Sequence, residues 1–515
     1  MLRVGLVNSR RLHSRVPSVA FKFRGFSEVR KPGSVDFNDS AISYASKTFP
    51  ELIRAYGVFQ ICRIKLLVNA SEFLVRNSYV ILGDKFTDWT MRTTFFGHFC
   101  AGEHSGDMGP TIKKLDSSGI GAILDYAAEA DIVEDEIRPL DEAEVKIKAR
   151  VYDYYNEGVC DARAKVFETC IRSAHDLYGD KARESFSALK ITALGNPALL
   201  ERISIAIVEI RNFFLKFDDD NTGVISKEQF KLHYEQNFTG GMDVDEVFRM
   251  MDVDDDNDID YIEWSNALTI EELHKLTSFC KDSGPLFKAT LTEEERALII
   301  VMRRRIEALA DLAQELDVRL MIDAEHTYFQ PAIDNISAGL MRKYNKDKPT
   351  IFGTYQMYLT DSIQRVTDDA KRADLGGYHF ACKLVRGAYM ELENKRAVDM
   401  GYISPIHPNK QATHDCYNRG VEFMIEQIAL GKDVELMLAT HNQYSVEAAL
   451  ERAAKHGLGP DSNIYFGQLL GMADHLTYAL GEKNFKAYKY VPFGKVKEVM
   501  PYLIRRAQEN SDMMG

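Results

Sequence analysis

The chain of 515 residues has few cysteines, no long apolar run and no excess of positive charge. Its seven cysteines are odd in number and none forms a C-x-x-C pair, so the sequence suggests neither a disulfide framework nor a zinc site. No apolar run reaches about 18 residues, so we expect no transmembrane helix. The formal net charge of -13 argues against a nucleic-acid partner, because such proteins usually present a basic face. The cysteine pattern fits a reducing compartment.

The beginning of the chain differs in composition from the rest. Residues 1–31 hold eight Lys or Arg residues and one acid, Glu28, and serines and bulky apolar residues lie between the cations. Spaced arginines with few acids are typical of a mitochondrial transit peptide, which we expect over residues 1–33. The alternative is a disordered basic tail.

A helical N-terminal region is expected over residues 34–92, where apolar residues recur at helical spacing. Its most apolar part, residues 52–68, is interrupted by Arg54, Arg63 and Lys65. We therefore expect a buried or interfacial amphipathic helix there.

Strand-length apolar runs then alternate with longer amphipathic stretches. This alternation predicts parallel βαβ units, and eight runs favour a (βα)8 barrel of the α/β class over an open doubly wound sheet. A dinucleotide-binding fold would require a G-x-G-x-x-G motif after the first run, and the sequence has none there. We expect the barrel in two parts, residues 93–198 and 288–515. The predicted strand runs are residues 93–101, 120–128, 187–194, 318–325, 351–359, 380–389, 434–442 and 463–472.

Polar residues lie near the carboxyl ends of six of these runs. Each alone could simply be a solubilising strand end. In a barrel, however, the carboxyl ends of different strands meet at one mouth, where catalytic groups collect. The six residues are Lys190, Asp323, Gln356, Arg386, His441 and Gln468.

Residues 199–287 interrupt the alternation and carry two acidic loops, 218–229 and 252–263. Calcium prefers six to eight oxygen ligands in a loop of about twelve residues, with a tight turn at the sixth and a bidentate carboxylate at the twelfth. The loops resemble a paired EF-hand with Ile225 and Ile259 opposite each other, and the alternative is an acidic module that binds nothing. The second loop is the better candidate, because the first ends in Gln229. The candidate calcium ligands are Asp252, Asp254, Asp256, Asp258, Asp260 and Glu263, and then Asp218, Asp220 and Thr222.

Near the C-terminus, Arg505 and Arg506 are adjacent on a helix expected from about residue 496, and Glu509 follows one turn later. A guanidinium matches a carboxylate with two parallel hydrogen bonds, so two of them suit a small ligand with one carboxylate. Glu509 is close enough to orient one guanidinium. Alone, such a pair is more often a solvated helix face.

Several separated motifs together resemble the proline dehydrogenase family. They are MIDAEHTYFQPAI, GTYQMYL, LVRGAYMELE, LATHN, GQLLGM and YVPFG…PYLIRRAQEN, and the calcium-loop insertion resembles that of animal members. The resemblance implies a (βα)8 barrel that binds FAD and oxidises L-proline to Δ1-pyrroline-5-carboxylate. It further implies ubiquinone as acceptor and peripheral association with the matrix side of the mitochondrial inner membrane.

The resemblance also implies roles for individual residues. The flavin contacts would be Gln356, Lys383, Arg386, Gly387 and His441. The substrate side would be formed by Lys190, Asp323, Tyr389, Leu469, Tyr490, Arg505, Arg506 and Glu509. Tyr490 favours proline over hydroxyproline, which needs room for a further hydroxyl. The alternatives are a hydroxyproline dehydrogenase and a calcium-responsive binding protein with an inactive barrel.

Overall fold

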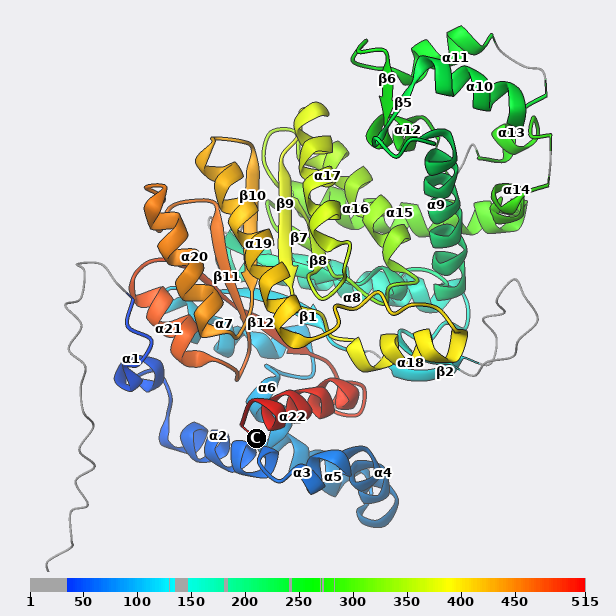
Figure 1. The fold of residues 1–515 in the computed structure, drawn as a ribbon. Coiled ribbons are helices and arrows are strands. Elements are labelled where there is room, and N and C mark those ends of the chain that lie inside the picture. Colours follow the sequence, from blue (N-terminus) through cyan, green and yellow to red (C-terminus); the bar gives the residue numbers. More distant parts are fainter. Residues whose placement is uncertain are drawn as a thin grey trace, which may run out of the picture. The chain divides into compact units, whose positions relative to one another are not determined.

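Eight parallel strands close into a barrel, in the hydrogen-bonded order β1-β12-β11-β10-β9-β8-β7-β4 (Figure 1). The structure is a computed structural model that describes residues 35–128, 130–134, 147–179, 184–239, 243–268, 270, 273–281 and 283–514. The (βα)8 prediction is confirmed and the open-sheet alternative is excluded. The expected transit peptide lies outside the described residues. The strands are β1 (Ile120–Tyr126), β4 (Phe186–Leu189), β7 (Arg319–Ile322), β8 (Ile351–Gln356), β9 (Phe380–Val385), β10 (Val434–Ala439), β11 (Ile464–Leu469) and β12 (Lys486–Phe493).

The barrel interior is filled by side chains from alternate strand positions, as strand geometry requires. Phe186, Phe352 and Tyr465 pack with their rings edge to face, with ring centroids 5.1 to 6.3 Å apart. The Arg319 guanidinium lies over all three rings and 3.3 Å from the Glu435 carboxylate. The barrel is therefore closed by packing at the amino ends of its strands, and a ligand must enter at their carboxyl ends.

Helices follow the strands and cover the outside of the barrel (Figure 1). The longest, α15, begins after Thr292, whose hydroxyl accepts from the Glu295 amide while the Glu295 carboxylate accepts from the Thr292 amide. An antiparallel pair, β2 (Ala130–Glu134) and β3 (Ile147–Val151), follows β1. The covering helices are α7 (Gly109–Asp116), α8 (Glu157–Tyr178), α15 (Glu293–Glu315), α16 (Gln330–Tyr344), α17 (Ser362–Leu375), α18 (Met390–Met400), α19 (Lys410–Ala429), α20 (Gln443–Lys455) and α21 (Asp474–Glu482).

One predicted strand is wrong and one strand was missed. The run 93–101 forms the end of α5 and helix α6, and it buries Phe96 and Phe99. A short apolar run fits either element, and here the residues three apart share a helical face. The first barrel strand is therefore β1, and the eighth is β12. In the sequence, Lys489 interrupts the apolar pattern that would indicate β12. In the structure Lys489 is buried, and its ammonium group is paired with the Asp474 carboxylate at 2.7 Å.

The N-terminal helices and the C-terminal helix α22 (Met500–Met514) pack together (Figure 1). Val58, Cys62 and Phe99 form one apolar cluster with Tyr502 and Leu503 of α22. The helix α22 begins at Met500, later than the expected residue 496. No helix of the described residues has the length and apolarity to cross a bilayer. The N-terminal helices are α1 (Ser40–Tyr44), α2 (Phe49–Cys62), α3 (Lys65–Asn69), α4 (Ser71–Leu82), α5 (Asp84–Thr93) and α6 (Phe95–Phe99).

The stretch between β4 and α15 holds two helix–loop–helix units. Their loops carry the short strands β5 and β6, which pair antiparallel with Ile225 opposite Ile259, as expected. Trp264 is buried against three phenylalanines of α9 and donates a hydrogen bond to the Ile210 carbonyl at 3.1 Å. The elements are α9 (Pro197–Phe217), β5 (Val224–Ser226), α10 (Lys227–Asn237), α11 (Val244–Met251), β6 (Asp258–Asp260), α12 (Tyr261–Ala267), α13 (Leu273–Thr277) and α14 (Pro285–Ala289).

Candidate active site

The six polar residues predicted at strand ends do lie at one mouth of the barrel. Each follows or ends a different strand at its carboxyl end, and the strands are parallel. By strand, they are Lys190 after β4, Asp323 after β7, Gln356 in β8, Arg386 after β9, His441 after β10 and Gln468 in β11.

Asp323 is the centre of a buried ion network at this mouth. One carboxylate oxygen accepts from the Lys383 ammonium at 2.5 Å, and the other accepts from Lys190 at 3.0 Å and from the Tyr490 hydroxyl at 2.6 Å. Burial alone would raise the pKa of Asp323, but the two ammonium groups and these hydrogen bonds outweigh it and hold the pKa well below its usual range. The Asp323 carboxylate is therefore a permanent negative charge between two cations. The contact of Lys383 with Asp323 was not predicted.

Asp125, at the end of β1, is a member of the network that sequence reasoning missed. Its carboxylate accepts from Lys190 at 3.0 Å, and it is only 2% exposed. Burial and the charges of Asp125 and Asp323 raise the pKa of the Tyr490 phenol well above its usual range. Tyr490 is therefore a neutral donor. The signal available in the sequence was a carboxylate inside an otherwise apolar strand.

Arg386 forms a second cluster with uncharged partners. Its guanidinium donates to His414 Nδ1 at 2.8 Å, to the Thr440 hydroxyl at 2.7 Å and to the Ser445 hydroxyl at 2.9 Å, and it lies 4.3 Å from the Tyr417 ring centroid. Burial lowers the pKa of Arg386, and burial together with the Arg386 charge lowers the pKa of His414. A half-buried cation bonded to neutral groups favours an anionic ligand.

Gln356 offers a free acceptor inside the mouth. Its amide nitrogen donates to the Glu325 carbonyl at 2.6 Å, whereas its oxygen is buried without a hydrogen-bond partner among the described residues. Nearby, Gly387 has a φ of 133°, and a Cβ there would lie 2.6 Å from the Tyr358 ring. The Gly387 backbone therefore requires glycine.

His441 is held neutral. Its Nε2 accepts from the Leu469 amide at 3.1 Å, so the proton lies on Nδ1. Burial, and then the charges of Arg506, Lys489 and Arg386, lower the pKa of His441 to about 3. The ring can therefore donate one hydrogen bond from Nδ1. Leu469 itself packs against the cluster under α22.

The arginine pair lies on α22, which packs against the strand-end loops. Arg506 is 5% exposed, donates to the Glu509 carboxylate at 2.6 Å and lies 4.9 Å from the Tyr502 ring centroid. Arg505 is less buried. Tyr502 belongs to one apolar cluster with Ala127, which follows β1, and Met472, which follows β11, so α22 lies against the carboxyl ends of these strands. The predicted contact between Glu509 and an arginine is confirmed.

Tyr389 begins the turn into α18, and its ring centroid is 4.3 Å from that of His326. His326 is in turn 3.0 Å from the Glu393 carboxylate. Tyr389 is 6% exposed. The structure therefore packs Tyr389 into the β7–β9 side of the mouth.

The predicted calcium ligands are only partly brought together. Carboxylate oxygens of Asp252, Asp254 and Asp256 lie within 4.8 Å of one another. Asp260 instead caps α12 and accepts from Lys371 at 2.8 Å, and Glu263 accepts from the Val253 amide at 2.7 Å. Thus three of the six predicted carboxylate ligands of the second loop converge.

Asp258 lies in β6, and burial together with the charges of Asp256 and Asp252 raises its pKa. In the first loop, Asp218 accepts from the Thr222 amide at 2.9 Å, and the Thr222 hydroxyl donates to Asp220 at 3.0 Å. The three predicted ligands of the first loop are therefore linked to one another by hydrogen bonds.

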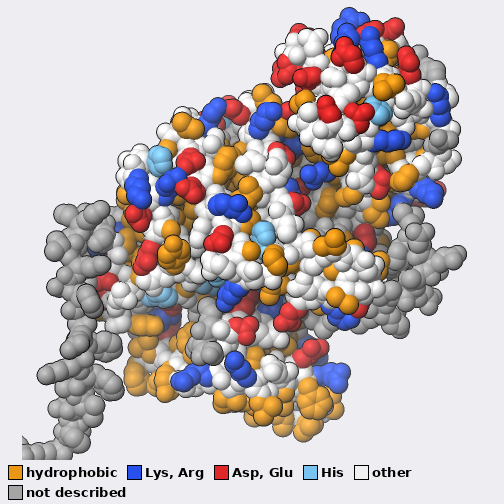
Figure 2. Space-filling view, viewed as in Figure 1, with side chains coloured by type: hydrophobic (Ala, Val, Ile, Leu, Met, Phe, Trp, Pro, Cys, Tyr) orange, Lys and Arg blue, Asp and Glu red, His pale blue; other side chains and the backbone are white. Residues whose placement is uncertain are grey.

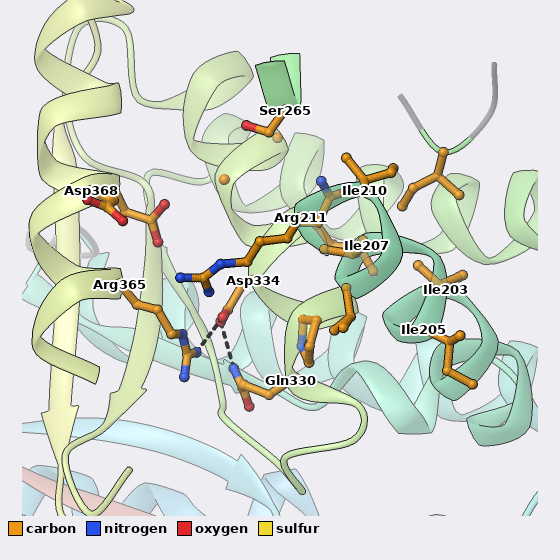
Figure 3. A pocket seen from close by; sticks show the side chains of 18 of the residues that line it. Ile203, Ile205, Ile207, Ile210, Arg211, Ser265, Gln330, Asp334, Arg365 and Asp368 are labelled. Atoms are coloured by element: carbon orange, nitrogen blue, oxygen red, sulfur yellow. Dashed lines mark hydrogen bonds and ion pairs between the residues drawn. The ribbon is translucent and has the colours of Figure 1, made fainter. Parts of the chain in front are cut away.

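A cavity of about 1190 Å³ lies outside the barrel, between α9 and α12 on one side and α15, α16 and α17 on the other. Figure 3 shows Arg211 of α9 extending toward the pair formed by Asp334 and Arg365, with Ile203 and Ile207 of α9 on the opposite side of the view. Burial raises the pKa of Asp334 to about 6 against the opposing effect of Arg365. None of the predicted site residues lines this cavity.

Comparison with known proteins gave concordant results. A family profile described as "Proline dehydrogenase" matches residues 108–515. "Proline dehydrogenase 1, mitochondrial" of Drosophila melanogaster is 34% identical over 95% of this chain and 79% of that protein, and the Homo sapiens protein of the same name is 34% identical over 94% and 88%. "Hydroxyproline dehydrogenase" of Xenopus laevis is 29% identical over 100% and 94%.

A solved structure with a similar fold is proline utilization A (PutA) from Bdellovibrio bacteriovorus, inactivated by N-propargylglycine. The TM-score is 0.55 at 16% identity, and the match covers 92% of this chain and 38% of that chain. This likeness supports the barrel fold.

Proposed function

We propose that this chain, which belongs to the proline dehydrogenase family, oxidises L-proline to Δ1-pyrroline-5-carboxylate with FAD as its cofactor. The observation that carries the proposal is the ion network around Asp323 at the barrel mouth, together with the buried Arg506 on α22, which packs against the residues that follow β1 and β11. The Arg386 guanidinium, whose hydrogen-bond partners are uncharged, suits a cofactor phosphate, and the arginine pair on α22 suits a small carboxylate.

The residues on the cofactor side fit a flavin dinucleotide. Arg386 has uncharged partners and can receive a phosphate, and the unpartnered Gln356 oxygen can accept from a ring N–H. His441 Nδ1 and Lys383 can donate, and Gly387 lets the backbone approach closely. When bound, a flavin accepts a hydride equivalent from the substrate carbon.

The residues on the substrate side fit proline. We assign Arg505 and Arg506 to the carboxylate, with Glu509 orienting Arg506. Lys190, which Asp125 and Asp323 hold in place, would lie near that carboxylate. Positioning is the main catalytic contribution of these side chains, since the carbon loses a hydride and the ring nitrogen a proton that solvent takes. Tyr389, Leu469 and Tyr490 would wall the ring.

A hydroxyproline dehydrogenase is the second candidate, because relatives with that name are 28% to 29% identical. Tyr490 argues for proline. Its hydroxyl is already engaged with Asp323 at 2.6 Å, which leaves its ring to fill the space that a substrate hydroxyl would need.

An EF-hand-like role is proposed for the insertion, with the loop 252–263 as its calcium site. The support is the convergence of Asp252, Asp254 and Asp256 and the pairing of Ile225 with Ile259. Calorimetric titration with calcium should give one site, which Asp254→Ala removes and Asp220→Ala retains. Absence of any calcium heat would reject this role.

The electron acceptor is proposed to be ubiquinone, with the protein held peripherally on the matrix side of the mitochondrial inner membrane. The support is that the most similar relatives reported above are named mitochondrial. A water-soluble ubiquinone analogue should be reduced in proportion to the proline consumed.

An anaerobic titration of the purified protein with proline tests the function. The flavin absorbance should be present in the folded protein and should bleach with proline at lower concentrations than with trans-4-hydroxyproline. A folded protein without flavin absorbance would favour the alternative of a calcium-responsive binding protein with an inactive barrel. Preferential bleaching by hydroxyproline would favour the second enzyme.

A further inference from the structure

Helix α2 has two apolar faces, of which only one is covered. Val58 and Cys62 are buried in the cluster with α22, whereas Phe49, Ile53 and Tyr56, on another face, are exposed. A surface helix normally places polar side chains opposite its buried face. The outer face of α2 is therefore unlike that of an ordinary surface helix.

The same exposure continues through α3, α4 and α5. Residues 49–89 hold 14 of the 31 exposed large hydrophobic residues found in the described part of the chain. Leu66, Val80 and Ile81 are 79%, 79% and 76% exposed. Figure 2 shows these hydrophobic side chains gathered along the lower edge, over the N-terminal helices of Figure 1. A contiguous patch of this kind marks a protein or membrane interaction surface.

The charge around the patch selects between these two partners. Residues 49–93 carry six Lys or Arg and four Asp or Glu, although the chain has a formal net charge of -13. Arg63, Lys65, Arg76 and Lys85 are exposed, and none forms an ion pair with the residues that the structure describes. A basic, apolar surface on an acidic protein complements an anionic lipid headgroup layer.

We propose that the outer face of α2 to α5, residues 49–93, is the surface by which this protein docks on an anionic phospholipid bilayer. The helices would lie in the headgroup layer with their apolar side chains inserted, since none of the described helices can span a bilayer. Trp89 and Tyr56 are amphipathic aromatic residues of the type enriched at this depth. The proposal assigns a surface to the peripheral location given above and rests on that part of the proposed function only.

Vesicle flotation of the full, flavin-loaded chain tests the surface. Wild type should float with vesicles containing phosphatidylglycerol and much less with phosphatidylcholine alone. The double variant Leu66→Glu/Ile81→Glu should bind at least tenfold more weakly. Leu430→Glu is the matched control, because Leu430 is also exposed, at 71%, but lies at the end of α19, and it should bind as wild type.

The basic leader is present in every variant, so its contribution to vesicle binding is constant. If the leader alone held the protein on vesicles, the double variant would bind like wild type and the proposal would be wrong. About 0.5 M salt screens exposed charges. Wild type should keep part of its binding there through apolar insertion.

Tryptophan fluorescence gives a local readout. The chain has two tryptophans, and Trp89 is 57% exposed whereas Trp264 is 2% exposed. Anionic vesicles should shift the emission to the blue and brominated lipid should quench it, and Trp89→Phe should remove both effects. A response that survives in Trp89→Phe would overturn the proposal.

Two further outcomes are informative. If the wild-type protein does not bind vesicles but self-associates, and the double variant is monomeric, the patch is a protein interface and the lipid proposal is wrong. Dye-coupled proline oxidation in solution should be equal in wild type and the double variant. Its absence in both would count against the proposed oxidation and leave the vesicle result standing.

Discussion

Replacing Arg506 by methionine tests whether α22 carries the substrate carboxylate site. Arg506 is 5% exposed and fixed by Glu509 at 2.6 Å, so its charge is desolvated and preorganised. Losing such a charge-paired contact costs about 2–5 kcal/mol. At about 1.4 kcal/mol per factor of ten, the KM for proline should rise roughly 30- to 4,000-fold.

Steady-state kinetics with an artificial acceptor measure this effect, and flavin absorbance before each assay confirms that the mutant is loaded. Arg505→Met should also raise KM, by a smaller factor because Arg505 is less buried. Gln508→Met on the exposed face of the same helix is the control and should leave KM unchanged. KM values within threefold of wild type in both arginine mutants would refute the carboxylate assignment.

Three further predictions concern the barrel mouth. Asp323→Ala leaves the ammonium groups of Lys190 and Lys383 without their shared carboxylate, so urea denaturation should show about 3–5 kcal/mol lower stability, and an unchanged midpoint would argue against a buried network. Arg386→Met should lower the fraction of flavin-loaded protein, measured by absorbance ratio, and equal loading would remove Arg386 from the cofactor site. His441 has a folded pKa of about 3 against 6.5 in the unfolded chain, so the folded state binds fewer protons and stability is lost as pH falls below 6.5. At pH 5 the loss relative to pH 7.5 should be about 2 kcal/mol, and His441→Gln should flatten this dependence.

Much of the barrel and of its mouth could be predicted from the sequence, because both have local signatures. Seven of the eight strand runs are short and apolar, and the polar residues that follow them in sequence necessarily meet where parallel strands end. The neighbouring arginines and Glu509 are on one helix, so their contact depends on helical spacing alone.

The remainder depends on contacts between residues far apart in sequence. The run 93–101 is apolar enough for a strand, and only its packing under α22 makes it a helix. Lys489 made β12 look exposed, and its burial is intelligible only with Asp474 beside it. The hydrogen-bond partners of buried polar groups also depend on distant residues, since Tyr490 donates to Asp323 across 167 positions of sequence.

The sequence by itself determined the class of fold, the residues at the strand ends and the arginine pair. Only the tertiary structure decided that Asp323 holds both Lys190 and Lys383, that Asp125 joins them, and that Arg386 is surrounded by neutral groups. The physical reason is that the position of a strand end follows from local pattern, whereas the partner of a buried charge is whichever opposite charge the closed barrel brings within hydrogen-bond distance.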